Sequence, residues 1–576
     1  MQWHVLPRSQ HLLFVGIACV CLLSGCAKDR SPDLYYHVIE FDSKGGILSP
    51  LTDKKFEKYP PPDQFKDILD KMQATLAGKT NPKVIVYVHG GLNTPSDAID
   101  IAQQHLADIT KQDPSCYPVF VIWNSGLFSS YGEHLFDVRQ GRDNSETHAW
   151  AFVDWPVYLV SDFLVAIARA PTVWMQQSTT DSDTVVAGVT SMLSYGRTQE
   201  ALQKQKKSGP TTRPDDSVER ADLWLERRNE VNTAAFFLVL NRLYFDDSHG
   251  PAARPTTQIS ISIGVDHSHP SDWIGRGTIY GMFLPFKLFF APIIDGLGTP
   301  AWRDMCRRAQ AIVDGSSDFT VNKNTTQDEI DDYVNRGTAG GLDLFISELA
   351  CRAHCAHDAT MPQWQVTLIA HSAGAIALDE VLRRQIQREL KGNAAPLPVR
   401  NIVYMAAACS IRDFTESVIP FMQMKTHRKV DFFNLTLHPS AETLDAEAWE
   451  LVPRGSLLCW IDDFLTSPQN PLDRTLGRWD NIVQTPYVFP QSLRGRVAIK
   501  AFALERLNTC STQPILDPQM HGDFTESPFW DPVFWKPDPP LNPNGARISV
   551  AEMEKERLKA IAPKAVNGPS DSTDAP

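Results

Sequence analysis

Ser372 stands where an apolar run meets a helix-like pattern, in the stretch VTLIAHSAGAIALDEVL at 366–382. Small residues flank this serine, in the pattern A-x-S-x-G formed with Ala370 and Gly374. Such residues let the chain turn sharply between a strand and a helix, and the turn lifts the serine hydroxyl above the sheet. The first N–H groups of the helix then point to the place where negative charge develops during acyl transfer. The pattern therefore predicts a nucleophilic serine.

The segments that must position this serine alternate between strand-like and helix-like patterns. Continuous apolar runs rich in β-branched and aromatic residues predict strands covered on both faces. These runs lie at 34–41, 83–89, 117–123, 364–370, 399–406, 429–437 and 495–504. Helix-like segments lie between them at about 95–112, 373–390 and 411–424. The alternation predicts an α/β fold with a mostly parallel, doubly wound sheet.

A long interruption of this rhythm divides the chain. Residues 126–360 are predicted to form a large, mainly helical insertion that caps the sheet, so that the core consists of 26–125 and 361–535. Within the insertion, the polar stretch 203–217 contains proline and glycine and predicts a flexible linker. The tail, 536–576, begins with KPDPPLNPNG and is predicted to be mostly disordered.

Two stretches of the insertion are strongly apolar, TIYGMFLPFKLFFAPIIDGLG at 278–298 and AFVDWPVYLVSDFLVAIARA at 151–170. The first is interrupted by Pro285, Lys287 and Pro292, so it is a poor membrane span. Both stretches could form a lid or a surface for acyl chains, or they could pack in the core. For the first, the sequence favours core packing.

The strand, Ser372 and the helix that follows together resemble the nucleophile elbow of the serine α/β-hydrolase superfamily, the lipases, esterases and related acyl hydrolases. The resemblance covers roughly 34–125 and 362–535 and does not include the insertion. It implies a sheet of the α/β-hydrolase type and cleavage of an ester or thioester through an acyl-enzyme intermediate. No cofactor is implied.

The resemblance also gives a role to the turn VIVYVHGGLN, where His89, Gly90, Gly91 and Leu92 follow an early strand. In this superfamily such a turn supplies one N–H of the oxyanion hole, and the residue after the nucleophile supplies the other. By that match Gly91 or Leu92 pairs with Ala373. The later turn IWNSG at 122–126 resembles a turn that follows the next strand in some of these hydrolases.

A serine hydroxyl is a poor nucleophile unless a base accepts its proton. In this superfamily the base is a histidine after the last strand, and His521 lies in a loop beyond the run at 495–504. His89 and His371 belong to the turn motifs, and His438 follows an earlier strand too closely. We therefore predict that His521 is the general base.

The acid that orients this histidine is less sharply defined. In the superfamily it follows the penultimate strand, where FFNLTLHPSAETLDAEAW offers Glu442, Asp445 and Glu447. Glu442 lies closest to the end of the strand and is the preferred candidate, with Asp445 as an alternative. Asp413 is a further alternative, because some lipases carry the acid after the preceding strand.

The N-terminus predicts export. A short segment with one arginine and no acid precedes the apolar run LLFVGIACVCLLSG, which is too short for a comfortable membrane span. Ser24 and Gly25 before Cys26 resemble the lipobox of bacterial lipoproteins, which implies a signal peptide at 1–25 and a lipid on the Cys26 thiol. Ala27 in the next position resembles an outer-membrane address. We expect a cell-envelope protein that meets the membrane through a lipid anchor, on the periplasmic side of the outer membrane.

Composition narrows the choice of partners. The chain has 576 residues, 43% of them hydrophobic, and can bury a large core. A net charge of −13 and the lack of a basic stripe argue against nucleic acid. Cys351, His354 and Cys355 lie near one face of a helix, but no second cysteine pair has the spacing of a structural zinc site, so no metal is predicted.

These features together predict a serine hydrolase that acts on a small-molecule or lipid ester. The alternative is a non-catalytic lipoprotein of the hydrolase fold that serves as a binding or scaffold module. A scaffold has no need of an elbow, a glycine turn and a late histidine together, so we prefer the enzyme.

Overall fold

The structure is a computed structural model of the chain. It describes residues 31–43, 45, 47–48, 61–91, 94–136, 138–139, 142–143, 155–176, 259–263, 270–314, 340–355, 363–392, 395–444, 455–483, 485–504 and 517–536. The predicted signal peptide, Cys26, the predicted linker at 203–217 and nearly all of the predicted tail lie outside the described residues.

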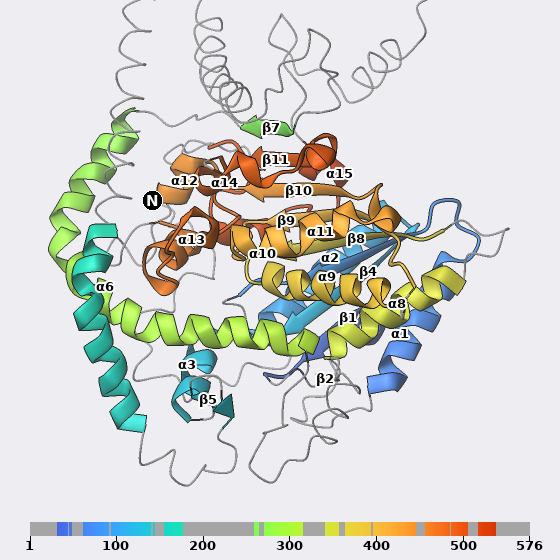
Figure 1. The fold of residues 1–576 in the computed structure, drawn as a ribbon, viewed down its shortest axis with the longest axis horizontal. Coiled ribbons are helices and arrows are strands. Elements are labelled where there is room, and N and C mark those ends of the chain that lie inside the picture. Colours follow the sequence, from blue (N-terminus) through green and yellow to red (C-terminus); the bar gives the residue numbers. More distant parts are fainter. Residues whose placement is uncertain are drawn as a thin grey trace, which may run out of the picture.

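A nine-stranded sheet forms the centre of the protein (Figure 1). In spatial order its strands are β2 (Ile47–Leu48), β1 (Val38–Phe41), β4 (Cys116–Trp123), β3 (Lys83–Val88), β8 (Gln365–His371), β9 (Val399–Met405), β10 (Asp431–Thr436), β11 (Val497–Ala501) and β7 (Ser260–Ile263). All neighbouring pairs are parallel except β1 and β2. Every residue of β4 is buried, as expected of a strand covered on both faces.

The seven predicted strands are confirmed, with their ends moved by a few residues. The largest change is at 34–41, where Leu34–Tyr36 belong to the short 3-10 helix η2 (Pro32–Tyr36) because Pro32 and the capping Ser31 start a turn there. Strand β7 was not predicted. It lies inside 126–360 and pairs with β11, so the insertion contributes a strand to the main sheet.

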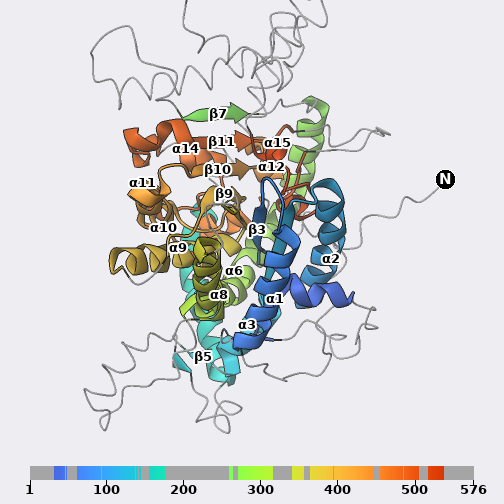
Figure 2. The ribbon, with the colours of Figure 1, turned by 90° about the vertical axis from the view of Figure 1, so that its right-hand side faces the viewer.

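Helices cover both faces of the sheet, which makes the fold α/β. Figure 2 shows α9 (Gly374–Leu390) and α11 (Val418–Gln423) on one side and α2 (Pro95–Gln112) on the other. The helices predicted at 95–112 and 373–390 are confirmed. The helix predicted at 411–424 is divided at Ser417 into α10 (Ile411–Glu416) and α11, and the Ser417 hydroxyl donates to the Asp413 carbonyl at this break.

A single long helix, α6 (Pro270–Asp314), dominates the described part of the insertion. Figure 1 shows it bent, with its first part at the left edge and its second part passing below α13 (Leu457–Trp460) and α9 in this view. Its internal prolines, Pro285, Pro292 and Pro300, explain the bending, since proline removes a backbone hydrogen bond and crowds the preceding turn. Trp302 and Met305 of the second part belong to the same hydrophobic core as the strands.

The remaining described part of the insertion includes α3 (Leu127–Phe136) and a helix at Trp155–Gln176, drawn in teal in Figure 1. The latter lies along α6, because a side chain at Gly296 would meet Phe163 and Ala166 at 3.3 and 3.4 Å. It is also fixed there by an ion pair of 3.1 Å between Arg169 and Asp295.

Candidate active site

The site lies where the direction of winding of the sheet reverses. Strands β3 and β8 are neighbours, but the chain continues from β3 to β4 on one side and from β8 to β9 on the other. In open α/β sheets, ligands bind beyond the carboxyl ends of the strands at such a switch point. The turn with His89 and Gly91 follows β3, and Ser372 follows β8. The topology thus brings two segments together that are far apart in sequence.

Ser372 has the backbone conformation of a sharp elbow. Its φ of 50° lies in the left-handed region, which costs a non-glycine residue about 1–3 kcal/mol. Three hydrogen bonds hold it: Ser372 N–H donates to Met405 O at 2.9 Å, and its carbonyl accepts from Ala408 N at 3.0 Å and Ala375 N at 3.1 Å. Helix α9 begins two residues later at Gly374.

Gly374 explains why the pattern needs a glycine at this place. A Cβ there would lie 2.5 Å from the carbonyl oxygen of Val88 and 2.7 Å from that of His89, closer than real Cβ contacts allow. The first turn of α9 therefore packs directly on the end of β3. This close approach sets the distance between the elbow and the glycine turn.

His521 supplies a base in contact with the serine. Its Nε2 lies 2.8 Å from Ser372 Oγ, and its carbonyl oxygen lies 3.1 Å from His371 Nε2. The turn that carries it is fixed by Asp523, whose Oδ2 accepts from Gln519 N at 2.9 Å and Met520 N at 2.8 Å. The structure thus brings together the predicted nucleophile and the predicted base, which are 149 positions apart.

The electrostatic surroundings keep this imidazole neutral. Burial, and then the neighbouring His371, lower the pKa of His521 well below its ordinary value. A neutral imidazole with its proton on Nδ1 presents Nε2 as an acceptor for the serine proton. Burial also lowers the pKa of His371 to about 4, so the two rings do not both carry charge at neutral pH.

The predicted oxyanion residues lie beside the elbow. A Cβ at Gly91 would lie 3.4 Å from the Cβ of Ala373, and one at Gly90 would lie 2.8 Å from the Cβ of Ser372. Ala373 is the N-cap of α9, where backbone N–H groups have no acceptor within the helix. Gly91 and Ala373 are therefore brought together as predicted. Leu92 lies outside the described residues.

The turn after β4 braces the glycine turn. Ser125 Oγ donates to the Gly90 carbonyl at 3.1 Å, and Trp123 N–H donates to His89 Nε2 at 2.9 Å. The indole N–H of Trp123 also donates to the His89 carbonyl at 3.2 Å. The turn at 122–126 that the sequence singled out thus holds the backbone of His89 and Gly90 in place.

Glu442, the preferred acid, is buried in α12 (Pro439–Leu444), after β10. Its carboxylate accepts a hydrogen bond from Ser456 Oγ, and its carbonyl accepts from Ser456 N at 2.8 Å. Among the described residues no hydrogen bond joins Glu442 to His521. The role of Glu442 as the orienting acid therefore stays a prediction.

Of the two alternative acids, the structure describes Asp413 but not Asp445. Asp413 completes the capping box of α10: its N–H donates to Ser410 Oγ at 3.0 Å, and its carboxylate accepts from Ser410 N–H at 3.3 Å and pairs with Arg383 at 2.8 Å. These contacts give its carboxylate a structural task at a helix start. Asp445 lies outside the described residues.

Helix α6, in the insertion that the sequence predicted to cap the sheet, packs on the site through residues beyond the apolar stretch at 278–298. Met305 packs on the glycine turn so closely that a Cβ at Gly91 would lie 2.5 Å from its Cε. Arg308 fixes this part of α6 by donating to the carbonyls of Asn124 and Ser129, both at 3.0 Å. Ser372, in the elbow beside the glycine turn, is fully buried. No local sequence pattern marks Met305, because its role depends on a contact between distant segments.

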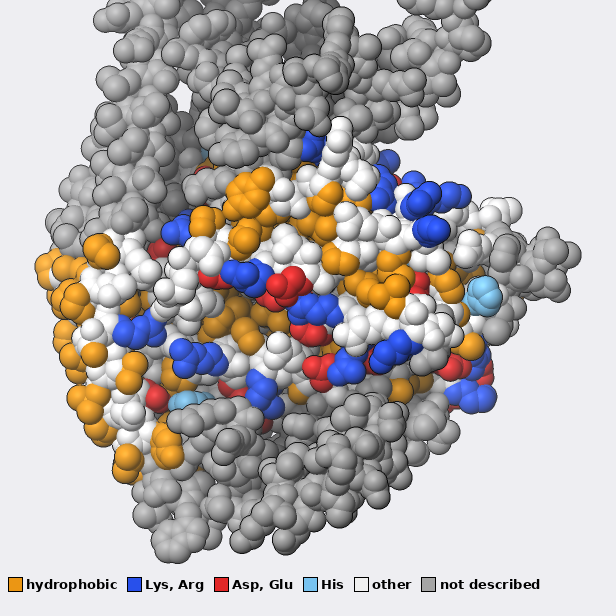
Figure 3. Space-filling view, viewed as in Figure 1, with side chains coloured by type: hydrophobic (Ala, Val, Ile, Leu, Met, Phe, Trp, Pro, Cys, Tyr) orange, Lys and Arg blue, Asp and Glu red, His pale blue; other side chains and the backbone are white. Residues whose placement is uncertain are grey.

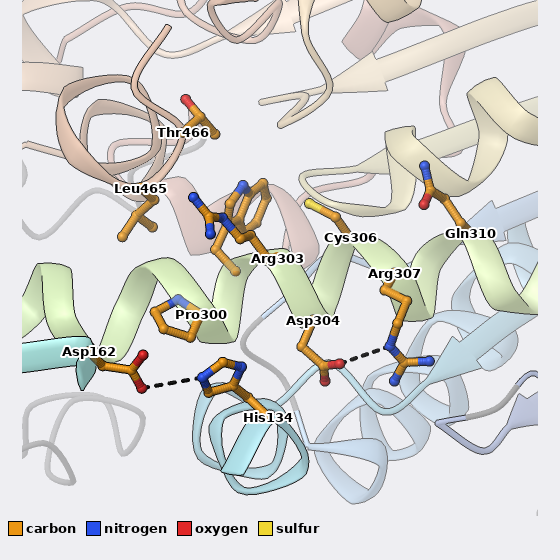
Figure 4. A pocket seen from close by; sticks show the side chains of 11 residues that line it. His134, Asp162, Pro300, Arg303, Asp304, Cys306, Arg307, Gln310, Leu465 and Thr466 are labelled. Atoms are coloured by element: carbon orange, nitrogen blue, oxygen red, sulfur yellow. Dashed lines mark hydrogen bonds and ion pairs between the residues drawn. The ribbon is translucent and has the colours of Figure 1, made fainter. Parts of the chain in front are cut away.

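A cavity of about 770 Å³ lies along the same helix (Figure 4). Its walls include an imidazole–carboxylate contact of 3.2 Å between His134 and Asp162 and an ion pair of 2.9 Å between Asp304 and Arg307. Neither Ser372 nor His521 lines it. The contact between serine and histidine, rather than the size of this cavity, therefore defines the candidate active site.

No group of three or more histidine, cysteine, aspartate or glutamate side chains suited to a metal occurs in the described part of the chain. Comparisons with protein-family models, with curated proteins and with solved structures found no match to this chain.

Proposed function

We propose that the protein is a serine hydrolase of the α/β-hydrolase type that cleaves an ester or a thioester through an acyl-enzyme intermediate. The observation that carries the proposal is the 2.8 Å contact between Ser372 Oγ and the neutral His521. The left-handed elbow at Ser372 and the neighbouring Gly91 and Ala373 support it, since acyl transfer needs a base and oxyanion donors on the same reacting centre.

In the proposed reaction Ser372 Oγ attacks the substrate carbonyl carbon while its proton passes to His521 Nε2. The carbonyl oxygen becomes an oxyanion beside the N–H groups near Gly91 and Ala373. The tetrahedral adduct collapses, and the leaving alkoxide or thiolate takes the proton from His521. Water then attacks the acyl-enzyme with His521 as base, which releases the acid and restores the serine.

The part of the insertion formed by α6 acts in this proposal as a cap. Since Ser372 is fully buried and Met305 packs on the glycine turn, a substrate reaches the hydroxyl only after Met305 moves. Substrates are small-molecule or lipid esters. The lipid anchor at Cys26 and the location in a bacterial cell envelope, facing the periplasm, are part of the same proposal.

Labelling with fluorophosphonates tests the chemistry directly. The adduct forms on a serine that has a base and oxyanion donors, and an ordinary serine has neither. We expect stoichiometric labelling at Ser372, none in Ser372→Ala, and a loss of several orders of magnitude in rate in His521→Ala. Ser492→Ala, at an exposed serine in η10 (Gln491–Arg496), is the matched control and should label normally.

Because Ser372 is buried, the labelling experiment includes one further variant. Met305→Ala should speed labelling by bulky probes more than by small ones, because it removes the side chain over the glycine turn. If neither the wild type nor Met305→Ala forms an adduct with any probe while both remain folded, the non-catalytic scaffold becomes the better hypothesis.

A further inference from the structure

Two helices of the insertion present an apolar surface to the outside. We call it the apolar helix face and define it by the residues Val157, Val160, Leu164, Val165, Ile167 and Phe289. Each of these side chains is more than half exposed, and Leu164 is 60% exposed. Figure 3 shows hydrophobic side chains gathered along the left edge of the protein, where Figure 1 places the helix at Trp155–Gln176 and the part of α6 beside it.

The charged residues of the helix Trp155–Gln176 point away from this face. Asp162 accepts from Tyr131 Oη at 3.1 Å and lies 3.2 Å from His134 Nε2. Arg169 pairs with Asp295 and donates to the Phe464 carbonyl at 2.7 Å. No charged side chain is exposed anywhere along Trp155–Gln176.

This arrangement is the reverse of a helix that faces water. A surface helix of a soluble protein buries its apolar stripe and turns its charges outward. Here only 17% of the most apolar window of the helix is buried, and both charges are turned inward. The apolar sequence around 155–170 is therefore not explained by core packing, one of the two interpretations that the sequence left open.

We propose that the apolar helix face lies in the hydrocarbon of one leaflet of a lipid bilayer. Within the described residues, Trp155–Gln176 is the one helix long and apolar enough to cross a membrane. However, Asp162 and Arg169 attach its inner side to the folded domain at points about two turns apart, so lipid cannot surround it. A helix with one apolar side and one protein-bound side lies in the plane of the membrane surface.

The chemistry of the face favours lipid over a protein partner. Protein interfaces have a polar rim and form about one hydrogen bond per 100–200 Å². The exposed residues of Trp155–Gln176 include only two hydroxyl side chains, Ser161 and Thr172, and otherwise consist of apolar residues. Hydrocarbon requires no hydrogen bonds from the protein, so a face of this composition suits it.

Photo-crosslinking in the full chain tests this inference without relying on hydrolysis or on the lipid anchor. A diazirine amino acid is placed at Leu164 or at Phe289, and the protein is reconstituted with phosphatidylcholine vesicles. The matched control carries the same group at Leu390, which is 75% exposed at the end of α9. Lipid adducts at positions 164 and 289 should exceed those at 390 by at least tenfold.

Each other result overturns the inference. Crosslinks from position 164 to another segment of this chain would mean that the protein covers the face itself, and crosslinks to a second copy would make it a subunit interface. Equal lipid adducts at 164 and 390, or none at either, would exclude a specific membrane-facing surface. Fluorophosphonate labelling of Ser372 is unaffected by all these outcomes, so the two proposals fail separately.

Discussion

Strand β3 and the helix Trp155–Gln176 are both apolar in sequence, yet they end in opposite environments. Five of the six residues of β3 are buried, whereas most residues of the helix are exposed. The strand is covered because helices pack on both faces of the sheet, whereas the charged side chains of the helix bind described residues on one side and leave its apolar side exposed. An apolar sequence therefore shows that a segment avoids water. It does not show whether protein or lipid surrounds that segment.

The two regions also use their polar groups differently. At the ends of β3 and β8, backbone and imidazole groups are held within a few ångströms of one another around Ser372. In the insertion, Asp162 and Arg169 serve to attach a helix to the domain. The first region should be sensitive to small changes in geometry, and the outer side of the second should tolerate them.

The largest expected effect concerns Glu442, the proposed orienting acid. Glu442→Gln should lower turnover, or the rate of fluorophosphonate labelling, by about 10³-fold or more, because an unoriented imidazole is a poor base. Asp413→Asn is the matched variant. Since Asp413 caps α10 and pairs with Arg383, it should reduce the free energy of unfolding and leave the rate within a few-fold. The opposite pattern would identify Asp413 as the acid.

Burial separates the two regions in a second experiment. Leu378 on α9 is 1% exposed and Leu164 is 60% exposed. Leu378→Ala should lower the free energy of unfolding by about 2–5 kcal/mol, because it leaves a cavity in the core. Leu164→Ala should change it by less than about 0.5 kcal/mol in lipid-free urea titrations. Equal losses would show that the folded protein covers Leu164, and the contrast between the regions would disappear.

Much of the sheet was predictable from the sequence. All seven predicted strands and two of the three predicted helices are present with small shifts, because long buried apolar runs carry a strong local signal. Strand β7, with the sequence SISI, was missed because its polar residues and short length give no such signal. The break at Ser417 was missed because it depends on side-chain contacts with Asp379 and Asp413.

The residues of the candidate site also divide into those that the sequence singled out and those that it did not. Ser372, His521, Gly91 and Ala373 are marked by local patterns and by their order relative to the strands, and the structure brings them together. The cover by Met305 is a tertiary contact that no sequence pattern specifies. Nor could the sequence decide between core packing and exposure for the apolar part of the insertion, since both environments select the same side chains.

Two glycine-to-alanine variants compare a closely packed position, Gly374, with an open one, Gly132. Gly374→Ala should lower the free energy of unfolding by about 1–3 kcal/mol and slow the labelling of Ser372, because the new methyl group overlaps the Val88 and His89 carbonyls and shifts α9. Gly132→Ala in α3 meets nothing within 4 Å, and it should raise stability by up to about 1 kcal/mol through helix propensity. Thermal melts of both variants check this. A harmless Gly374→Ala would mean that the elbow tolerates looser packing than its contacts suggest.

The last expected effect is a pH dependence of stability that originates in the site region. Burial lowers the pKa of both His89 and His371 from 6.5 to about 4. Above pH 6.5 neither ring binds a proton in either state, so their contribution to stability is complete. Between pH 6.5 and about 4 the unfolded chain binds protons that the folded protein does not, so stability falls as pH falls, by up to about 1.4 kcal/mol per pH unit for each histidine. Below about pH 4 no further loss from these groups follows.

Urea titrations at pH 7.5, 6 and 5 measure this slope. His371→Asn should make this slope shallower, because it removes one of the two rings whose pKa is lowered by burial. Leu164→Ala should have the same small effect at every pH, because the outward side of Trp155–Gln176 carries no titratable group. A slope that His371→Asn leaves unaltered would show that this ring takes up its proton at the same pH in the folded and unfolded protein, and the lowered pKa of His371 would have to be abandoned.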